Sequence, residues 1–250
     1  MSEQLSRTER ILGAGAMARL RRSRVAVFGA GGVGGFVIEA LSRSGIGALD
    51  IIDSDTVALS NLNRQIIATR STVGRLKVDA FAERIADIDP EVCVRTYPVF
   101  YLPDSEEAAL FNFKDYDYVV DAIDTVAAKI DIILRAQEAG VPVISSMGCG
   151  NRIDPGKLAI MDLSKTSMDP LARTMRRELK KRGVAHVKVL CSSESPLRPV
   201  ADGPADGQLS GSADERPKRM APGSTAFVPA SAGLMIAAEV VRELSGIANV

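Results

Sequence analysis

Two hydrophobic periods alternate along residues 24–155. Short, almost uninterrupted apolar runs predict strands at 24–28, 48–53, 92–97, 117–121 and 142–146. Patterns with helical spacing separate these runs, near 33–44, 75–88, 104–111 and 126–139. The apolar runs lack polar alternation, which is typical of strands covered on both faces. We therefore predict a Rossmann-like, doubly wound α/β fold, with a mainly parallel sheet and helices on both faces.

The pattern changes after residue 155. Strands are predicted at 158–163 and 187–191, and helices at 169–182 and 229–244. Another helix is expected at 5–22, near the N-terminus. The segment 195–223 is rich in Pro, Gly, Ser and charged residues, so we expect a mobile loop that cannot stay ordered alone.

Composition narrows the class of protein. The 250 residues carry no formal net charge, so any nucleic-acid site must be a local patch. No apolar run approaches the ~18 residues of a membrane helix and no signal core begins the chain, so the cytoplasm is expected. Cys93, Cys149 and Cys191 form no C-x-x-C pair, which excludes a four-cysteine zinc site. His186 is the only histidine, which excludes a histidine-based zinc cluster.

A glycine-rich turn follows the first strand. Gly29, Gly31 and Gly34 fit G-x-G-x-x-G, with Gly32 in the same turn, between a strand and a helix. Such a turn lets backbone N–H groups reach a phosphate at the helix N-terminus. Asp53 ends the second strand, where its carboxylate can accept hydrogen bonds from ribose hydroxyls. Nucleotide binding is therefore predicted.

Polar residues after the second strand indicate more than nucleotide binding. Asn61, Arg64 and Gln65 form a cluster that an ordinary NAD site does not need. An arginine can fork onto two phosphate oxygens, and Lys77 can act as a point charge. From spacing alone, however, Lys77 is a solvated helix lysine. Asp55 either caps the next turn or contacts the nucleotide.

Several of these motifs together resemble a known superfamily. The glycine turn, the D-x-D-x-V-x-x-S-N-x-N-R-Q run that starts at Asp53, and Gly74-Arg75-Leu76-Lys77-Val78 are similar to the ubiquitin-activating-enzyme superfamily, the ThiF/MoeB/HesA adenylating enzymes. Three further runs resemble the subgroup that dehydrates threonylcarbamoyladenosine in tRNA: Asp121–Asp124, Gly150–Pro155 and Asp169–Ala172. The chain departs from relatives at Arg216, where a glycine is usual, and in lacking zinc cysteines.

The resemblance implies a single adenylating domain over 1–250, with an N-terminal helix in 1–23, a nucleotide-binding core over 24–155 and a partly antiparallel part over 156–250. It implies ATP and Mg²⁺, with Asp53 on the ribose, the Asp124 carboxylate on the metal, and catalytic roles for Arg64 and Lys77. Arg10 would reach the ATP of the other subunit in a homodimer. Asp121 is interpreted as a structural carboxylate.

The implied reaction adenylates the threonine carboxylate of threonylcarbamoyladenosine in tRNA, and the neighbouring carbamoyl group then closes a ring. One alternative is adenylation of a ubiquitin-like sulfur carrier, with a cysteine desulfurase or sulfur acceptor as a partner. Alternatives of another class are an NAD-dependent oxidoreductase and a non-catalytic nucleotide-binding module.

The sequence leaves two interpretations open for the 169–182 helix and two for Cys191. The 169–182 helix, with Leu171, Met175 and Leu179 inward, is either a solvated basic surface or a contact for tRNA phosphates, which Lys218 and Arg219 would extend. Its basic residues, set against the single acid Glu178, are Arg173, Arg176, Arg177, Lys180, Lys181 and Arg182. Cys191 is either a buried small hydrophobe or a reactive thiol.

Overall fold

One twisted sheet organises the computed structural model, which describes residues 3–198 and 222–247. Its seven strands have the order β3-β2-β1-β4-β5-β7-β6. All neighbours are parallel except β6 and β7, which are antiparallel. The predicted fold class is therefore confirmed. The strands are β1 Arg24–Phe28, β2 Ala48–Ile52, β3 Cys93–Tyr97, β4 Tyr118–Asp121, β5 Val143–Ser146, β6 Leu158–Asp162 and β7 Lys188–Ser192.

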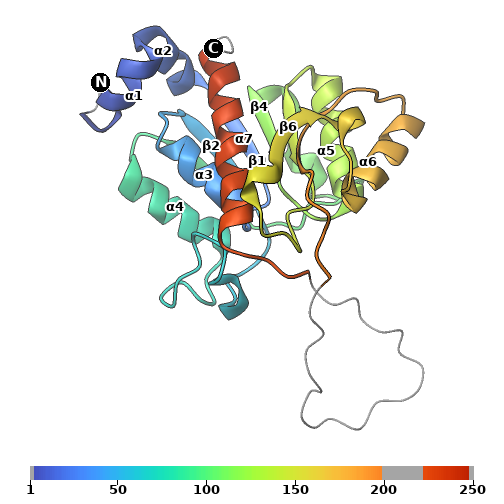
Figure 1. The fold of residues 1–250 in the computed structure, drawn as a ribbon. Coiled ribbons are helices and arrows are strands. Elements are labelled where there is room, and N and C mark those ends of the chain that lie inside the picture. The colour runs from blue at the N-terminus through green and yellow to red at the C-terminus, as the bar shows by residue number, and fades with distance from the viewer. Residues whose placement is uncertain (1–2, 199–221, 248–250) are drawn as a thin grey trace.

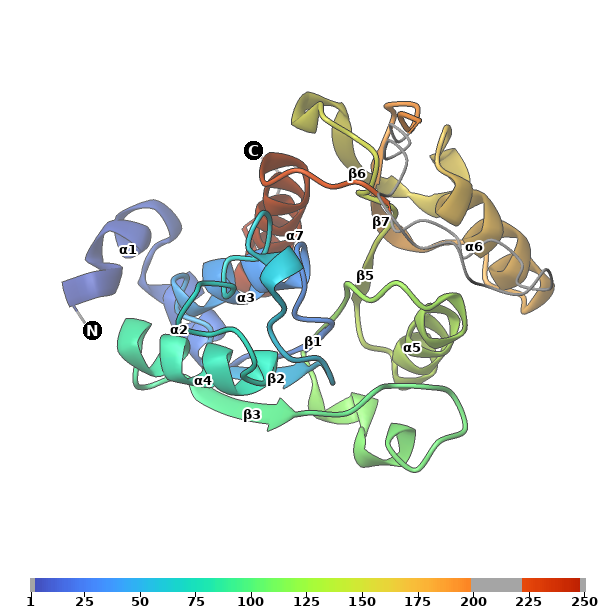
Figure 2. The ribbon, with the colours of Figure 1, turned by 90° about the horizontal axis from the view of Figure 1, so that it is seen from below.

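Helices cover both faces of the sheet, as Figure 2 shows. Helices α2 Ala14–Arg22, α3 Gly34–Ser42, α4 Lys77–Ile88 and α7 Phe227–Ser245 lie on one face. Helices α5 Val126–Ala139 and α6 Pro170–Lys181 lie on the other. This arrangement explains the apolar strand runs, because every residue of β2 and β4 is buried.

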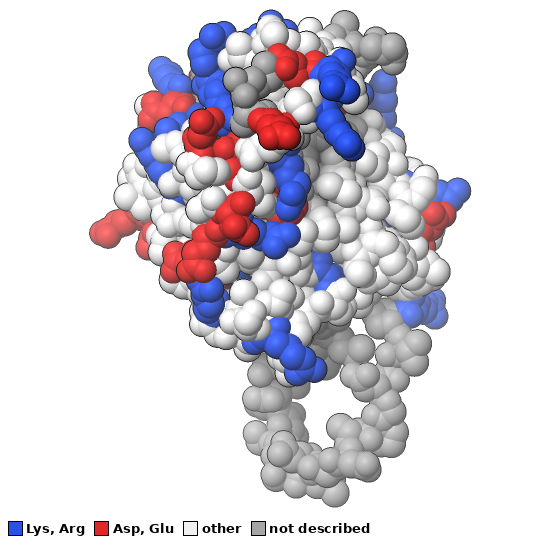
Figure 3. All heavy atoms as spheres, turned by 90° about the vertical axis from the view of Figure 1, so that its left-hand side faces the viewer, with Lys and Arg blue, Asp and Glu red and all other residues white. Residues whose placement is uncertain are grey.

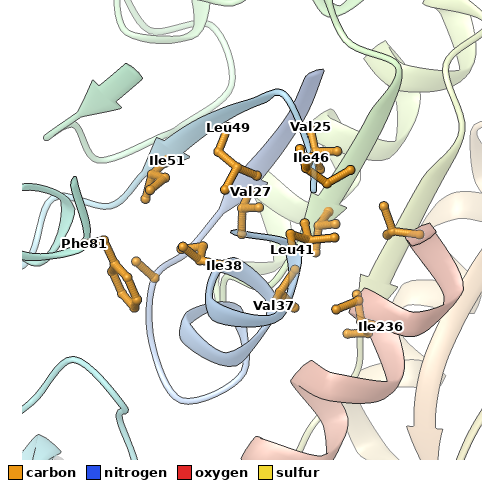
Figure 4. Close-up of a cluster of buried hydrophobic side chains, with 14 of the residues drawn as sticks. Val25, Val27, Val37, Ile38, Leu41, Ile46, Leu49, Ile51, Phe81 and Ile236 are labelled. Carbon is orange, nitrogen blue, oxygen red and sulfur yellow. The ribbon is translucent and has the colours of Figure 1, made fainter. Parts of the chain in front are cut away.

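Strand β1 supplies both hydrophobic cores, because successive side chains of a strand point to opposite faces. Val25 and Val27 join the core under α3 and α7, and Figure 4 shows them in one cluster with Leu41 of α3 and Ile236 of α7. Ala26 and Phe28 join the core on the α5 face, where Phe28 packs edge-on against an aromatic cluster. The two cores fix the direction in which the end of β1 points, and the glycine turn begins at that end.

Two predicted helices differ from the structure. The helix expected at 5–22 is broken at Gly13, whose φ of +82° ends α1 Ser6–Leu12 before α2 begins. The helix expected at 104–111 is wrong, since only the 3-10 turn Ala108–Leu110 forms there. Asp104 has a left-handed φ of 57°, and Phe111 is drawn into the aromatic core instead of extending a helix.

Helix α7 crosses back over the sheet after the last strand (Figure 1). It packs closely on α3, since a Cβ at Gly233 would lie 2.4 Å from the carbonyl oxygen of Val33. The start of α7 consequently lies beside the glycine turn. The predicted loop at 195–223 falls largely outside the described residues. No helix within 3–198 and 222–247 has the length and apolar character to cross a membrane.

Candidate functional site

A pocket of about 480 Å³ opens at the carboxyl ends of β1, β2 and β4. The strand order reverses between β1 and β4, and ligands of open α/β sheets bind at such a point. Ten of the predicted site residues line the pocket: Gly29, Gly31, Gly32, Asp53, Asp55, Asn61, Arg64, Gln65, Lys77 and Asp124. Sequence positions nearly a hundred residues apart thus converge on one cavity.

The glycine turn has no room for side chains at two positions. Gly29 has a φ of +92°, and a Cβ there would lie 2.7 Å from the carbonyl oxygen of Ala122. A Cβ on Gly34 would lie 1.7 Å from the carbonyl oxygen of Gly29. Gly34 does not line the pocket, so its role is to let α3 begin tightly against the turn. The N-terminus of α3, with its positive dipole end, therefore faces the cavity.

Asp53 holds this turn in place. Its Oδ2 accepts a hydrogen bond from the N–H of Ala30 at 2.7 Å, and its Oδ1 accepts one from the N–H of Asp55 at 2.8 Å. Each carboxylate oxygen has a further lone pair that can accept from a ligand hydroxyl. Asp53 therefore has a structural task beside the predicted ribose contact, which the sequence did not indicate.

Lys77 is a buried cation at the first position of α4. Its side chain is 4% exposed, and its Nζ lies 2.7 Å from Oδ2 of Asp55 and 3.4 Å from Oδ1 of Asp53. It is therefore no solvated helix lysine. The prediction that Asp55 caps the next turn is wrong, because the described contact of its carboxylate is this ion pair.

Asn61, Arg64 and Gln65 differ in how they are held. Oδ1 of Asn61 accepts from the N–H of Ala58 at 3.0 Å, which closes its own short turn. Nη1 of Arg64 donates to the carbonyl oxygen of Ser60 at 3.0 Å and to Oδ1 of Asn63 at 2.9 Å, and Arg64 lines the pocket. Gln65 is 7% exposed, and its Oε1 has no protein partner among the described residues. A buried acceptor at a pocket wall suits a ligand or water donor.

The two aspartates around β4 have separate roles. Asp121 is fully buried, lies 2.9 Å from the equally buried Nζ of Lys129, and accepts from Oγ of Ser145 at 2.5 Å. The structural interpretation of Asp121 is confirmed, with an ammonium as its main partner. Strand β4 ends at Asp121, as predicted, and Asp124 follows it by three residues. Asp124 is exposed on the pocket wall, just before Thr125 at the start of α5.

The donor set of the pocket fits Mg²⁺ only together with phosphate oxygens. Within residues 3–198 and 222–247, no group of three or more His, Cys, Asp or Glu side chains could hold a metal. Mg²⁺ is usually bound through one or two carboxylates plus substrate phosphates and waters. The exposed carboxylate of Asp124 can supply one such ligand.

Sequence reasoning missed two walls of the pocket. Ile52, Val99, Phe100, Tyr101 and Ile123 form an apolar wall. Three of these residues directly follow β3, and an apolar run at that sheet edge was the available signal. A second wall comes from Pro222–Ser224 and Pro229 at the start of α7, beside Gly150 of the β5–β6 connection. This wall could not be predicted, because its residues come from segments that are far apart in the sequence and share no local pattern.

Arg10 lies away from this pocket. Leu5, which precedes α1, approaches within 3.1 Å of a Cβ built on Gly45 after α3, and Arg19 of α2 donates to the carbonyl oxygen of Ser245 at the end of α7. The pocket lies at the beginnings of α3 and α7. Because α7 has 19 residues, its two ends are about 28 Å apart. Exposed Arg10 therefore does not serve the pocket of its own chain.

Neither Cys149 nor Cys191 is an activated thiol. Cys191 is 2% exposed, and burial raises its pKa to about 11, so the interpretation as a buried hydrophobe holds. Cys149 was not singled out from the sequence, yet it lines the pocket. Burial raises the pKa of the Cys149 thiol as well. Both side chains are therefore thiols at neutral pH, which is a poor state for a nucleophile.

Helix α6 is less basic on its surface than its sequence indicates. The guanidinium of Arg176 turns inward and donates to the carbonyl oxygen of Thr166 at 2.6 Å. Lys181, Arg177 and Arg182 converge on Glu178, and their hydrogen bonds lower its pKa to about 2.

The apolar side of α6 differs slightly from the prediction, which placed Leu171 inward with Met175 and Leu179. In the structure Ala172 is buried with Met175 and Leu179, and Leu171 is only half-buried. On the face that carries α1, α2 and α4, acidic and basic residues are likewise interspersed (Figure 3).

Known proteins are similar to this chain along almost its whole length. A family model described as the ThiF family matches residues 1–250, and the chain belongs to that family. The tRNA threonylcarbamoyladenosine dehydratase of Bacillus subtilis (strain 168) is 42% identical over 247 residues, which cover 98% of this chain and 95% of the relative.

Solved structures agree as well. E. coli tRNA N6-threonylcarbamoyladenosine dehydratase in complex with AMP matches with a TM-score of 0.84 and 33% identity, covering 98% of this chain and 94% of that one. The same enzyme in complex with ATP matches with a TM-score of 0.83 and 31% identity, over the same shares of the two chains. The resemblance stated from the motifs is confirmed.

Proposed function

We propose that the chain is an ATP-dependent tRNA threonylcarbamoyladenosine dehydratase, which adenylates the threonine carboxylate and lets the modified nucleoside cyclise. The observation that carries this proposal is Lys77, a buried ammonium that lines the same pocket as the glycine turn. A buried charge destabilises the fold unless an opposite charge lies beside it. Here the carboxylates of Asp53 and Asp55 pair with the Lys77 ammonium, which stays charged and in place beside the nucleotide site. The full-length match to dehydratases supports the substrate.

ATP would lie along the pocket with its adenine on the apolar wall of Ile52, Val99 and Ile123 and its ribose at Asp53. The phosphates would then reach Gly31 and the N-terminus of α3, where backbone N–H groups and the helix dipole favour negative charge. Residues at the beginnings of α4, α5 and α7 also line the pocket, and the positive dipole ends of these helices would favour an anion there.

In the first step a carboxylate oxygen of the substrate forms a bond to the α-phosphorus, and pyrophosphate leaves with the electrons of the broken P–O bond. Negative charge builds on the phosphoryl oxygens, and preorganised donors lower the barrier by meeting it. Arg64 and Lys77 supply those donors, and Asn61 and Gln65 add amide groups. Lys77 would exchange Asp55 for phosphate oxygens when ATP binds.

Asp124 would hold Mg²⁺, which neutralises phosphate charge when bound. In the second step the carbamoyl group attacks the acyl carbon and AMP leaves. Neither step needs a protein thiol, which agrees with the raised thiol pKa values of Cys149 and Cys191.

The active unit would be a homodimer in which Arg10 completes the pocket of the other subunit. Arg10 is exposed and too far from its own pocket, and the neighbouring Ile11 is 83% exposed. An apolar side chain so exposed is a natural contact for a partner surface. Mixing inactive Arg10→Ala and Lys77→Ala chains should restore activity, since one pocket of each mixed dimer is intact. Persistent inactivity despite proven subunit exchange would count against this role.

ATP–pyrophosphate exchange tests the proposed function against its rivals. Exchange should depend on tRNA that carries threonylcarbamoyladenosine, and unmodified tRNA is the matched control. Dependence on a ubiquitin-like carrier protein instead would identify the sulfur-carrier alternative. Absence of exchange with every substrate, together with tight ATP binding, would identify a non-catalytic nucleotide-binding module.

A further inference from the structure

Two hydrogen bonds join the pocket wall Pro222–Ser224 to Asn151 of the β5–β6 connection. The N–H of Asn151 donates to the carbonyl oxygen of Gly223 at 2.7 Å, and the N–H of Gly223 donates to Oδ1 of Asn151, also at 2.7 Å. The carbonyl oxygen of Asn151 accepts from the N–H of Leu197 at 2.7 Å. Asn151 thus binds the chain both after β7 and where it returns toward α7.

Asn151 has an unusual backbone for this task. Its φ of 58° lies in the left-handed region, which few residues other than glycine adopt, and such conformations cluster at functional sites. The connection around it is firmly anchored. The buried guanidinium of Arg152 lies 2.9 Å from Asp169, and the N–H of Asp154 donates to Glu194 at 3.0 Å. Asn151 therefore holds the wall from a rigid base.

The wall lines the pocket on the side of the glycine turn, where the phosphates would lie in the proposed reaction. Nδ2 of Asn63 donates to the carbonyl oxygen of Ser224 at 3.1 Å, and the same carboxamide accepts from Arg64. A Cβ built on Gly32 would lie 3.3 Å from Cβ of Pro229 and 3.6 Å from Cγ of Arg64. The wall consequently stands beside the glycine turn and Arg64, where the acyl-adenylate of the proposed reaction would form.

An acyl-adenylate has two competing fates. In productive cyclisation the carbamoyl group forms a bond to the acyl carbon, the bond from that carbon to the phosphate oxygen breaks, AMP leaves with the electron pair and the nucleophile loses a proton. In hydrolysis a water oxygen forms the bond instead, AMP leaves, and the carboxylate is regenerated with loss of two protons. Hydrolysis wastes one ATP, so exclusion of water decides the yield.

We propose that Asn151 is a positioning residue that keeps the Pro222–Ser224 wall closed over the acyl-adenylate, so that the intermediate cyclises and is not hydrolysed. This inference rests on the proposed function. If Asn151 has this role, its replacement should divert the acyl-adenylate from cyclisation to hydrolysis. The rate of adenylation should stay the same.

Asn151→Gly tests the idea, because glycine keeps the left-handed backbone while the carboxamide, with the Oδ1 acceptor of the Gly223 N–H, is removed. Asn151→Asp is the matched control, since it keeps an acceptor at the same place and also tolerates this conformation. Gly150→Ala is an independent second variant. Its Cβ would lie 2.8 Å from Cβ of Pro222, so the wall would have to shift outward.

The readout is AMP formed per cyclic nucleoside formed, measured at early times with modified tRNA in water labelled with heavy oxygen. The ratio should be about one for the native chain and for Asn151→Asp. In Asn151→Gly and Gly150→Ala the excess of this ratio over one, which equals the ratio of hydrolysis to cyclisation, should rise roughly fivefold, since loss of a hydrogen bond changes a rate ratio by about that factor. Heavy oxygen should then appear in the carboxylate of the linear nucleoside, and pyrophosphate exchange by Asn151→Gly should stay near native.

Suppose that the native chain forms about one AMP per cyclic nucleoside and that both variants do the same. That result would overturn the inference and leave the proposed function standing. Loss of pyrophosphate exchange in Asn151→Gly would also overturn it, because the residue would then act in binding or adenylation. A native chain that forms neither AMP nor cyclic nucleoside would overturn the proposed function, and the inference with it.

Discussion

The buried ion pair between Asp121 and Lys129 offers a quantitative test of the fold around the pocket. Both side chains are fully buried, with 2.9 Å between Oδ2 and Nζ, and Nζ also donates to the carbonyl oxygen of Ile123 at 3.1 Å. Lys129→Met leaves the Asp121 carboxylate buried with only a hydroxyl and an amide for partners. Removing one partner of a buried pair costs about 3–5 kcal/mol, a large part of the ~5–15 kcal/mol that stabilises a typical protein.

Urea unfolding followed by circular dichroism measures this loss, at one protein concentration because of the proposed dimer. The double variant Asp121→Asn with Lys129→Met should recover much of the stability, since no buried charge remains unpaired. Lys165→Met is a surface control, because Lys165 is exposed, and its effect should stay within ~0.5 kcal/mol. A loss below about 1 kcal/mol for Lys129→Met, or a double variant that loses the sum of both single losses, would refute the reasoning.

The pocket and helix α6 support further expectations. Asp53→Ala should weaken ATP binding in calorimetry by about 1.5–3 kcal/mol through lost hydrogen bonds to a charged group, and tight NAD binding without ATP binding would contradict the nucleotide assignment. Asp124→Asn should keep the fold and lose most turnover, because a neutral amide holds Mg²⁺ poorly; an unchanged Mg²⁺ dependence would argue against this role. Replacing Arg173 and Lys180 with Gln should lower the salt slope of tRNA filter binding by about two, and an unaltered slope would make α6 an ordinary solvated surface.

Most strands of the sheet could be predicted, because each one is encoded by a short run of consecutive residues. Strands such as Val25–Phe28 and Tyr118–Asp121 are buried on both faces, and continuous apolar runs report that burial directly. The wrong helix at 104–111 shows the limit of such patterns. Its apolar residues satisfy a helical spacing, but Phe111 gains more by joining the aromatic core around Phe28.

The pocket could be predicted where one short motif carries the chemistry. The glycine turn and the run from Asp53 to Gln65 supply most of one side of the cavity. The rest depends on tertiary contacts that no local pattern reveals. The sequence of helix α6 indicates a uniformly basic surface. In the structure, however, Arg176 donates to a backbone carbonyl, and three other basic side chains contact Glu178. Asn151 likewise became informative only when its contacts with Gly223 were visible.

The modified nucleoside in tRNA is the product that distinguishes the proposed dehydratase from its alternatives. The purified chain is incubated with ATP, Mg²⁺ and tRNA that carries threonylcarbamoyladenosine, and the nucleosides are then analysed by mass spectrometry under mild conditions. The proposed function predicts conversion to a nucleoside lighter by one water, with AMP and pyrophosphate formed, and loss of conversion in Lys77→Ala. An unchanged nucleoside mass, in the presence of ATP binding and folded protein, would contradict it.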